Sequence, residues 1–222
     1  MSTVFFIVLP YLALALAVGV AAYRFYARPF TYSSLSSQLL ESRKLFWGSV
    51  PWHYGIGLIL LAHLLAAFFP ALAGVLLGSP LRRLVLEATG IALAVYALLG
   101  LVLLIVRRIG YAALPRFVTS RMDGLLLALL LFQVATGIGV ALFNRWGGLW
   151  YLHTAVPWFW SLARLHPEIA TVAALPALVQ FHFVVGMLII LVFPFSRLVH
   201  LIKFPLRYLW RPYQKVVWYR HD

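Results

Sequence analysis

The sequence predicts an all-α integral membrane protein: a five-helix bundle that forms a single membrane domain over residues 1–222. Two observations on composition lead to this fold class. Of the 222 residues, 64% are hydrophobic and only 10% are charged, and the mean hydropathy is +0.96. Soluble domains are nearer half apolar and a quarter charged. The third observation is that five separate stretches are apolar over the roughly 20 residues that a helix needs to cross a bilayer.

The five predicted spans contain few polar side chains and no Asp, Glu or Lys. They cover about residues 4–23, 52–72, 88–106, 125–143 and 178–199. The first has no positive charge before its apolar run, so we expect a retained helix and not a signal peptide. The second contains His53 and His63, the third ends at two arginines, and the fourth contains Gln133. The fifth contains His182 and ends near His200.

The basic residues predict the orientation of the bundle. The net charge is +13, and fourteen of the 18 Lys and Arg residues fall on one side of the predicted topology. Because Lys and Arg are retained on the cytoplasmic side, the N-terminus is predicted outside, in the periplasm, and the C-terminus inside. The charge therefore reports topology, and no nucleic-acid partner is expected. Residues 203–222 alternate basic and aromatic side chains and are predicted to be a cytoplasmic tail that docks a partner.

A loop of about residues 144–177 connects the fourth and fifth spans on the predicted outer side. It is rich in tryptophan and other aromatic side chains. Aromatic residues at this density are typical of a segment that lies at the membrane–water interface. We therefore expect this loop to lie on the outer surface.

Four of the seven histidines lie in or at the ends of the predicted spans: His53, His63, His182 and His200. The chain has no cysteine, which excludes disulfides, covalently attached c-type haem and iron–sulfur clusters held by this chain. An ionisable residue at membrane depth is costly and indicates function. A metal or proton transporter would bring acids into the membrane, whereas four hydrogen-bonded structural histidines remain an alternative. The other three histidines are predicted to lie at the surface: His153, His166 and His221.

The spacing of the four histidines predicts which of them face one another. His53 and His63 lie about 15 Å apart along a helix, and His182 and His200 about 27 Å apart on one face. Antiparallel packing then pairs His63 with His182 near the outside and His53 with His200 near the inside. Helix tilt or an irregular helix end around residues 49–53 is expected to absorb the difference of about 12 Å. Two facing imidazoles are the axial ligands of a six-coordinate b-type haem, so two non-covalent haems are predicted.

Two arginines at the end of the third span are candidates to bind a haem. Arg107 and Arg108 lie level with the inner histidine pair, where they could donate to the haem carboxylates. Simple anchoring of the helix on the cytoplasmic side explains them equally well.

Five segments of the chain carry a resemblance to a known family. They are SSQLLESRK (Ser36–Lys44), WHYGIGLILLAHL (Trp52–Leu64), RRIGYAALPRFVTSRMDG (Arg107–Gly124), QFHFVVGMLIILVFPFSRLVHL (Gln180–Leu201) and PYQKV (Pro212–Val216). Together they resemble the gamma subunit of respiratory nitrate reductase, a membrane cytochrome b with two haems. The resemblance covers nearly the whole chain and weakens in the two outer loops.

The resemblance implies an oxidoreductase subunit in a bacterial or archaeal cytoplasmic membrane. Such a subunit oxidises quinol near the outer face and passes electrons through two b haems to a cytoplasmic Fe–S beta subunit. A molybdenum-bearing alpha subunit then reduces nitrate. By position, the resemblance assigns the outer haem iron to His63 and His182 and the inner one to His53 and His200.

The resemblance also places the quinol site near the outer haem. The family's lysine before the third helix is replaced here by Arg82 and Arg83, and its glycine before the outer ligand by Ala62. These residues and His63, whose second ring nitrogen could bond a quinol oxygen, are the candidates. No general base for quinol is visible. Two alternatives remain: the same scaffold in another cytoplasmic-facing reductase or oxidoreductase complex, and a non-haem transporter or structural anchor.

Overall fold

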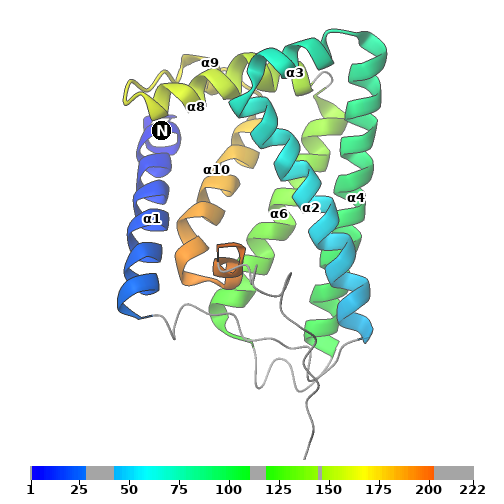
Figure 1. The fold of residues 1–222 in the computed structure, drawn as a ribbon, viewed down its shortest axis with the longest axis vertical. Coiled ribbons are helices and arrows are strands. Elements are labelled where there is room, and N and C mark those ends of the chain that lie inside the picture. The colour runs from blue at the N-terminus through cyan, green and yellow to red at the C-terminus, as the bar shows by residue number, and fades with distance from the viewer. Residues whose placement is uncertain (1, 29–42, 111–118, 145–146, 203–222) are drawn as a thin grey trace, which may run out of the picture.

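The computed structural model describes residues 2–28, 43–110, 119–144 and 147–202, whose regular elements are all helices (Figure 1). Five apolar helical segments are long enough to cross a membrane. They are η1 (Val4–Val8) continued by α1 (Leu9–Ala27), α2 (Arg43–Phe68), α4 (Pro80–Gly110), α6 (Arg121–Phe143), and α10 (Ala177–Val192) continued by η4 (Phe193–Phe195). The five predicted helices are thereby confirmed. The predicted docking tail, residues 203–222, lies outside the described residues.

Two helices extend well beyond the apolar runs that predicted them. The predicted third span, 88–106, becomes α4, which begins at Pro80 and includes Glu87. The predicted fourth span becomes α6, which begins at Arg121 and includes Asp123. Apolar runs mark only the part of a helix suited to hydrocarbon, whereas backbone hydrogen bonding continues through charged residues beyond it. Acidic side chains that the sequence placed outside the spans therefore lie on the spanning helices.

The predicted second span contains a break near the end of α2. The chain leaves helical geometry at Phe69, with φ −123° and ψ 60°, and the short helix α3 (Pro70–Leu77) follows. Pro70 lacks an amide hydrogen and disfavours helical geometry in the residue before it, which explains this boundary. Residues 69–72 thus belong to a turn and a new helix and not to a single span.

The predicted fifth span also ends early, and this corrects one expectation. α10 stops at Val192, and η4 and η5 (Arg197–Leu201) continue as separate 3₁₀ turns. Pro194 lies in the first turn, and Ser196 is extended between the two, with φ −109° and ψ 178°. We expected either helix tilt or an irregular helix end at residues 49–53 to absorb the difference between the two His–His spacings. α2 is continuous at residues 49–53 but runs obliquely (Figure 1), and the irregular backbone lies at η4 and η5, just before His200.

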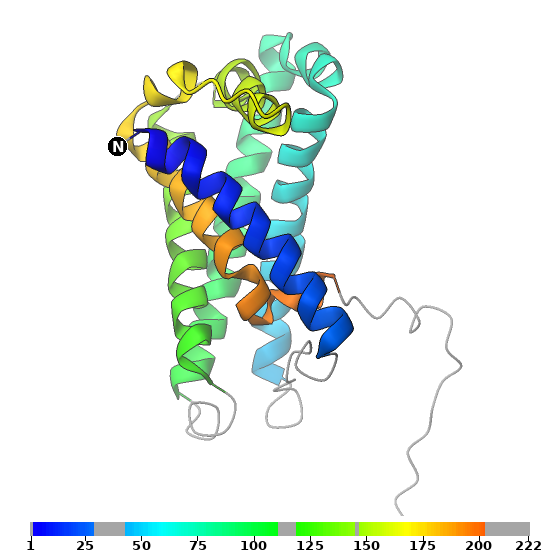
Figure 2. The same cartoon turned by 90° about the vertical axis from the view of Figure 1, so that its left-hand side faces the viewer.

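The five segments pack in the spatial order α1, α10, α6, α4 and α2, each mainly against the next. Figure 1 shows α2 running obliquely, beside α4 at one end and toward α8 at the other, and Figure 2 shows α1 running obliquely across α10. α2 packs along α4 and not along α10. The two helices that carry the histidines of the spans therefore face each other across the interior of the bundle.

Glycines bring α2 and α4 into close contact. A Cβ atom built on Gly100 would lie 2.5 Å from the backbone nitrogen of Trp52 and 2.7 Å from the carbonyl oxygen of Gly48. One built on Gly55 would lie 2.8 Å from the carbonyl oxygen of Leu93. Small residues permit such approach between membrane helices, where van der Waals packing replaces the hydrophobic effect as the driving force. This contact fixes the register of α2, and hence the depth of its histidines.

Short helices lie across one end of the bundle, which we call the covered end (Figures 1 and 2). They are α3, α7 (Gly147–Trp150), η3 (Tyr151–Ala155), α8 (Val156–Ala163) and α9 (Ala170–Ala173). Trp158 is buried, donates from Nε1 to the carbonyl oxygen of Phe6 at 3.1 Å and stacks on Phe183 with centroids 5.7 Å apart. Trp160 donates to the carbonyl oxygen of Ala67 at 2.9 Å. The aromatic loop thus fastens α1, α2 and α10 together.

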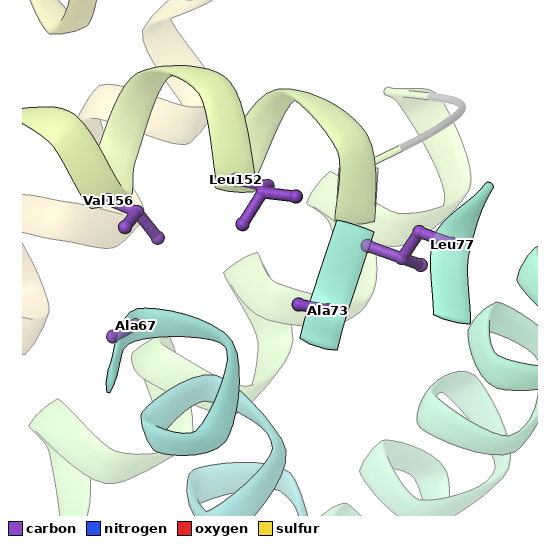
Figure 3. Close-up of a cluster of buried hydrophobic side chains, with 5 residues drawn as sticks. All are labelled: Ala67, Ala73, Leu77, Leu152 and Val156. Atoms are coloured by element: carbon purple, nitrogen blue, oxygen red, sulfur yellow. The ribbon is translucent and has the colours of Figure 1, made fainter. Parts of the chain in front are cut away.

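A cluster of apolar side chains joins the ends of α2 and α3 to residues 147–173, which form α7, η3, α8 and α9 and which we call the covering segment. Figure 3 shows its five buried members, Ala67, Ala73, Leu77, Leu152 and Val156. The first three come from α2 and α3, and the last two from η3 and α8. Burying these groups against one another holds the covering segment over His63, which lies one helical turn before Ala67.

Replacing Gly100 by alanine should destabilise the protein. The added methyl group must displace backbone atoms of α2, and overpacking of this kind costs about 2 kcal/mol. We expect G100A to lower the midpoint of thermal unfolding in detergent clearly. G90A is the matched control on the same helix, because a Cβ at Gly90 meets no atom within 4 Å. Equal midpoints for the two variants would contradict the described contact of α2 with α4.

Candidate functional site

Two histidines face each other at the end of the bundle opposite the covered end. His53 comes from α2 and His200 from η5, and their ring centroids are 6.0 Å apart with an interplanar angle of 71°. We call this the basic end, because Arg24, Arg107, Arg108 and Arg197 gather there. Both rings are exposed in the protein chain alone. The two side chains can therefore offer a nitrogen each to a group held between them.

A second pair lies toward the covered end. His63 on α2 and His182 on α10 are near neighbours in space. The ring of Tyr151 meets that of His63 edge-on, with centroids 5.2 Å apart, and its hydroxyl donates to the carbonyl oxygen of His63 at 3.2 Å. Since α2 is continuous and His53 and His63 are ten residues apart, the two pairs are separated by about 15 Å along the helix.

Hydrogen bonds fix the same ring nitrogen in all four histidines. Nδ1 of His53 lies 2.8 Å from the carbonyl oxygen of Ser49, and Nδ1 of His63 lies 2.8 Å from that of Ile59. Nδ1 of His200 lies 2.6 Å from the carbonyl oxygen of Arg197. A carbonyl oxygen only accepts, so each Nδ1 carries the proton and donates it. The lone pair of each ring is then on Nε2.

His182 also carries its proton on Nδ1, but the acceptor is a side chain and not a main-chain carbonyl. Its Nδ1 lies 3.0 Å from Thr136 Oγ1, and this hydroxyl itself donates to the carbonyl oxygen of Phe132 at 2.7 Å. The hydroxyl therefore accepts from Nδ1 of His182. On the other side of the ring, Nε2 lies 3.2 Å from Nε2 of Gln133, so the amide donates to it. All four histidines thus present an Nε2 lone pair, the form in which imidazole binds metal.

Small residues beside His182 keep room for its ring. A Cβ on Gly137 would lie 3.0 Å from Cε1 of His182, which is tighter than ordinary contact. A Cβ on Gly186 would lie 3.5 Å from Nε2 of Gln133. The other amide atom of Gln133, Oε1, is buried, and no described residue forms a hydrogen bond with it. The interior next to His182 therefore contains a polar side chain that is only half satisfied.

An ion-pair network at the basic end holds the backbone that bonds His200. Asp123 is 3% exposed and accepts from Nε of Arg197 at 2.8 Å, while Nη1 of Arg108 lies 4.0 Å from its other oxygen. Asp123 also closes a capping box with Ser120 at the start of α6. One carboxylate thus connects α4, α6 and η5, and Arg197 supplies the carbonyl oxygen that orients His200.

The remaining predicted site residues occupy different places. Arg82 donates to the carbonyl oxygens of Val75 at 2.8 Å and Leu76 at 3.2 Å, so it closes the end of α3. Ala62 is exposed beside His63, and Arg83 follows Arg82 on α4. Arg107 is buried at the basic end, next to Arg108.

Sequence reasoning missed several residues of this arrangement. Asp123 and Arg197 were not singled out, although the serine that starts the capping box and the Arg three residues before His200 are visible signals. Thr136 lies three residues after Gln133, the one amide of its span, so a polar face of α6 was also visible. Glu87 was hidden because its helix was predicted to begin after it.

The chain is similar to several known proteins. The family model described as nitrate reductase gamma subunit matches residues 2–219. The nitrate reductase gamma chain of Bacillus subtilis strain 168 is 31% identical over 209 residues, which cover 93% of each chain. The respiratory nitrate reductase 1 gamma chain of Escherichia coli K12 is 30% identical over 216 residues, 96% of this chain and 95% of that one. The nitrate reductase-like protein NarX of Mycobacterium tuberculosis H37Rv is 29% identical over 222 residues, 96% of this chain and 33% of that protein.

Removing the charge of Asp123 should destabilise the basic end. In D123N, Arg197 and Arg108 keep their charges in a largely buried site without a counter-charge, which typically costs about 3 kcal/mol. We expect a lower midpoint of thermal unfolding and a loss of the fixed geometry of His200. R121Q is the control, because Arg121 is exposed on the same turn of α6. A D123N midpoint equal to that of R121Q would refute a stabilising role for this network.

Proposed function

This chain belongs to the nitrate reductase gamma subunit family, and on that premise we propose that it is the quinol-oxidising membrane cytochrome b of a respiratory nitrate reductase. Its apolar helices make it a multi-pass membrane protein. In the proposed function, quinol is oxidised near the covered end. Electrons then pass through two b-type haems to a cytoplasmic Fe–S beta subunit and a molybdenum-bearing alpha subunit that reduces nitrate.

The observation that carries this proposal is the common orientation of the four histidines. Each ring donates from Nδ1 and so leaves Nε2 for a metal. The 6.0 Å between the centroids of His53 and His200 leaves room for one ion between them, because imidazole binds metal at about 2 Å. Among the described residues no third histidine, cysteine or carboxylate joins either pair. Two axial nitrogens are what a bis-histidine haem takes from its protein, and these residues fit that group.

The residues behind the histidines would hold and tune a bound haem. Haem supplies the one-electron chemistry, while the protein sets position, axial ligation and potential. Donation from Nδ1 to a carbonyl oxygen makes an imidazole ligand more basic and fixes its plane. For His182 the acceptor is the hydroxyl of Thr136. The hydroxyl of Ser49 also lies 3.1 Å from Nδ1 of His53. Gln133 occupies Nε2 of His182 and must move aside when that nitrogen binds iron.

We further propose that the basic end faces the cytoplasm and the covered end faces outward. Described Lys and Arg residues gather at the basic end: Arg24, Arg28, Lys44, Arg107, Arg108, Arg121 and Arg197. Only Arg82, Arg83 and Arg164 lie toward the covered end among the described residues. By the positive-inside rule this asymmetry sets the orientation. His53 and His200 are then the inner pair, next to the partner subunits, and Arg107 and Arg108 are the proposed cations for the inner haem carboxylates.

Single histidine variants should remove one haem each. In H182A the outer pair loses a ligand and in H200A the inner pair does, so each variant should retain about half of the wild-type haem absorbance per chain. Dithionite-reduced minus oxidised spectra of the purified complex measure this. H166A is the control, because His166 is an exposed residue of the covering segment. Wild-type haem content in H182A or H200A would remove that pair from the proposal.

Cysteine labelling should report the orientation cleanly, because the natural chain has no cysteine. We expect H166C to react with a membrane-impermeant maleimide in intact cells. R121C, an exposed position at the basic end, should react only after the membrane is opened. The reverse pattern would contradict the proposed orientation.

A further inference from the structure

One carboxylate at the covered end has no role in the arrangement described so far. Glu87 lies on α4, two turns after its start at Pro80. Its Oε1 atom is buried and has no hydrogen-bond partner among the described residues. A Cβ built on Gly148 would lie 3.8 Å from this oxygen, so the carboxyl group lies against the backbone of α7. A buried, unused acceptor is costly and requires an explanation.

Glu87 lies at the same depth in the bundle as His63. α2 and α4 are antiparallel, and their contact pairs Gly48 with Gly100 and Gly55 with Leu93 and Ala97. Because both helices advance by the same rise per residue, continuing this register from Gly55 brings His63 level with Glu87. The covering segment connects the two: Gly148 lies against Glu87, and Tyr151, three residues later, contacts His63.

The neighbouring polar groups are poor proton acceptors. Nδ1 of His63 already donates its proton to the carbonyl oxygen of Ile59. This ring therefore has no free nitrogen once Nε2 binds metal. Tyr151 donates its hydroxyl to the carbonyl oxygen of His63, and burial raises the pKa of its phenol above the ordinary value of 10.0. Arg82 donates to α3. An arginine cannot accept a proton at physiological pH.

Among the described residues, few elements bring titratable or charged groups near Glu87. Arg83 precedes it by one turn on α4, and Arg82 lies beside Arg83. Tyr151 and His153 are the titratable groups of α7 and η3, and α3 contains none. The other acid described on this side, Glu168, is exposed in the turn after α8. Glu87 is thus the one described carboxylate that combines burial, an unused oxygen and the depth of His63.

We propose that the Glu87 carboxylate is the base that accepts protons from quinol, at a site bounded by α4, by the segment of Gly148 and Tyr151, and by His63. This inference rests on the proposed function. Each quinol loses two protons and two electrons and leaves as quinone. The protons pass one after the other to Glu87 and from it to water at the covered end. A haem held by His63 and His182 would take up the two electrons one at a time.

The test compares three variants in the intact complex with a short-chain naphthoquinol as substrate. Glu87→Gln keeps the size of the side chain and removes the base, and Glu87→Asp keeps a carboxylate. E168Q is the matched control at the same end. General-base catalysis contributes about 100-fold or more, so kcat of E87Q should fall by at least that factor. E87D should recover most of the rate, and E168Q should equal the wild type.

A second measurement does not depend on turnover. Infrared difference spectra between the quinol-reduced and oxidised complex should contain a carboxyl band from protonated Glu87. We expect this band to vanish in E87Q and to shift in E87D, with the haem spectrum after dithionite unchanged in both. An E87Q rate within tenfold of the wild type, or an unchanged carboxyl band, would overturn the assignment of Glu87. A wild-type complex whose haems are reduced by dithionite but not by quinol would instead overturn the proposed function itself.

Discussion

The hydrogen bond donated by Nδ1 of each membrane histidine is the interaction on which the rest of the site depends. It keeps the proton on Nδ1 in all four imidazoles, so that the lone pair is on Nε2 and points away from the backbone. In three of them the acceptor is a main-chain carbonyl within the preceding helical turn. The orientation is therefore a consequence of local helical geometry. The fourth, His182, needs Thr136 on a neighbouring helix, so its orientation depends on how α10 packs against α6.

The packing of the bundle brings the two members of each pair together. The glycine contact with α4 fixes the register of α2. On the opposite side of the bundle, α10 packs against α6 and α1. The two histidine-bearing helices are thereby held apart, with both pairs between them. At the basic end, the 3₁₀ turns and the Asp123–Arg197 ion pair bring His200 to the level of His53. At the covered end, Trp158 donates a hydrogen bond to η1 and stacks on Phe183 of α10, and Trp160 donates a hydrogen bond to α2.

Much of this arrangement could be predicted from the sequence, because hydropathy and helical rise are local properties. The five spans and the choice of neighbouring histidines follow from apolar runs and from the spacings of His53, His63, His182 and His200. The shape of the fifth segment could not be predicted in the same way. A proline such as that of FPFSRLVH can either bend a helix or end it, and here α10 ends at Val192, while Ser196 and Arg197 form bonds beyond it. Charged residues next to apolar runs were also misplaced, since Glu87 and Asp123 continue the helices that hydropathy ended.

The electron paramagnetic resonance spectrum of the oxidised complex tests the central claim most directly, because it reports the ligands of each iron. Bis-histidine ligation at both pairs predicts two low-spin ferric signals, one per haem, and no high-spin haem signal. Two signals in equal amounts would identify two six-coordinate haems, each with strong axial ligands, as the four Nε2 atoms require. A high-spin signal, or only one low-spin species in a fully loaded complex, would contradict the pairing of His53 with His200 or of His63 with His182.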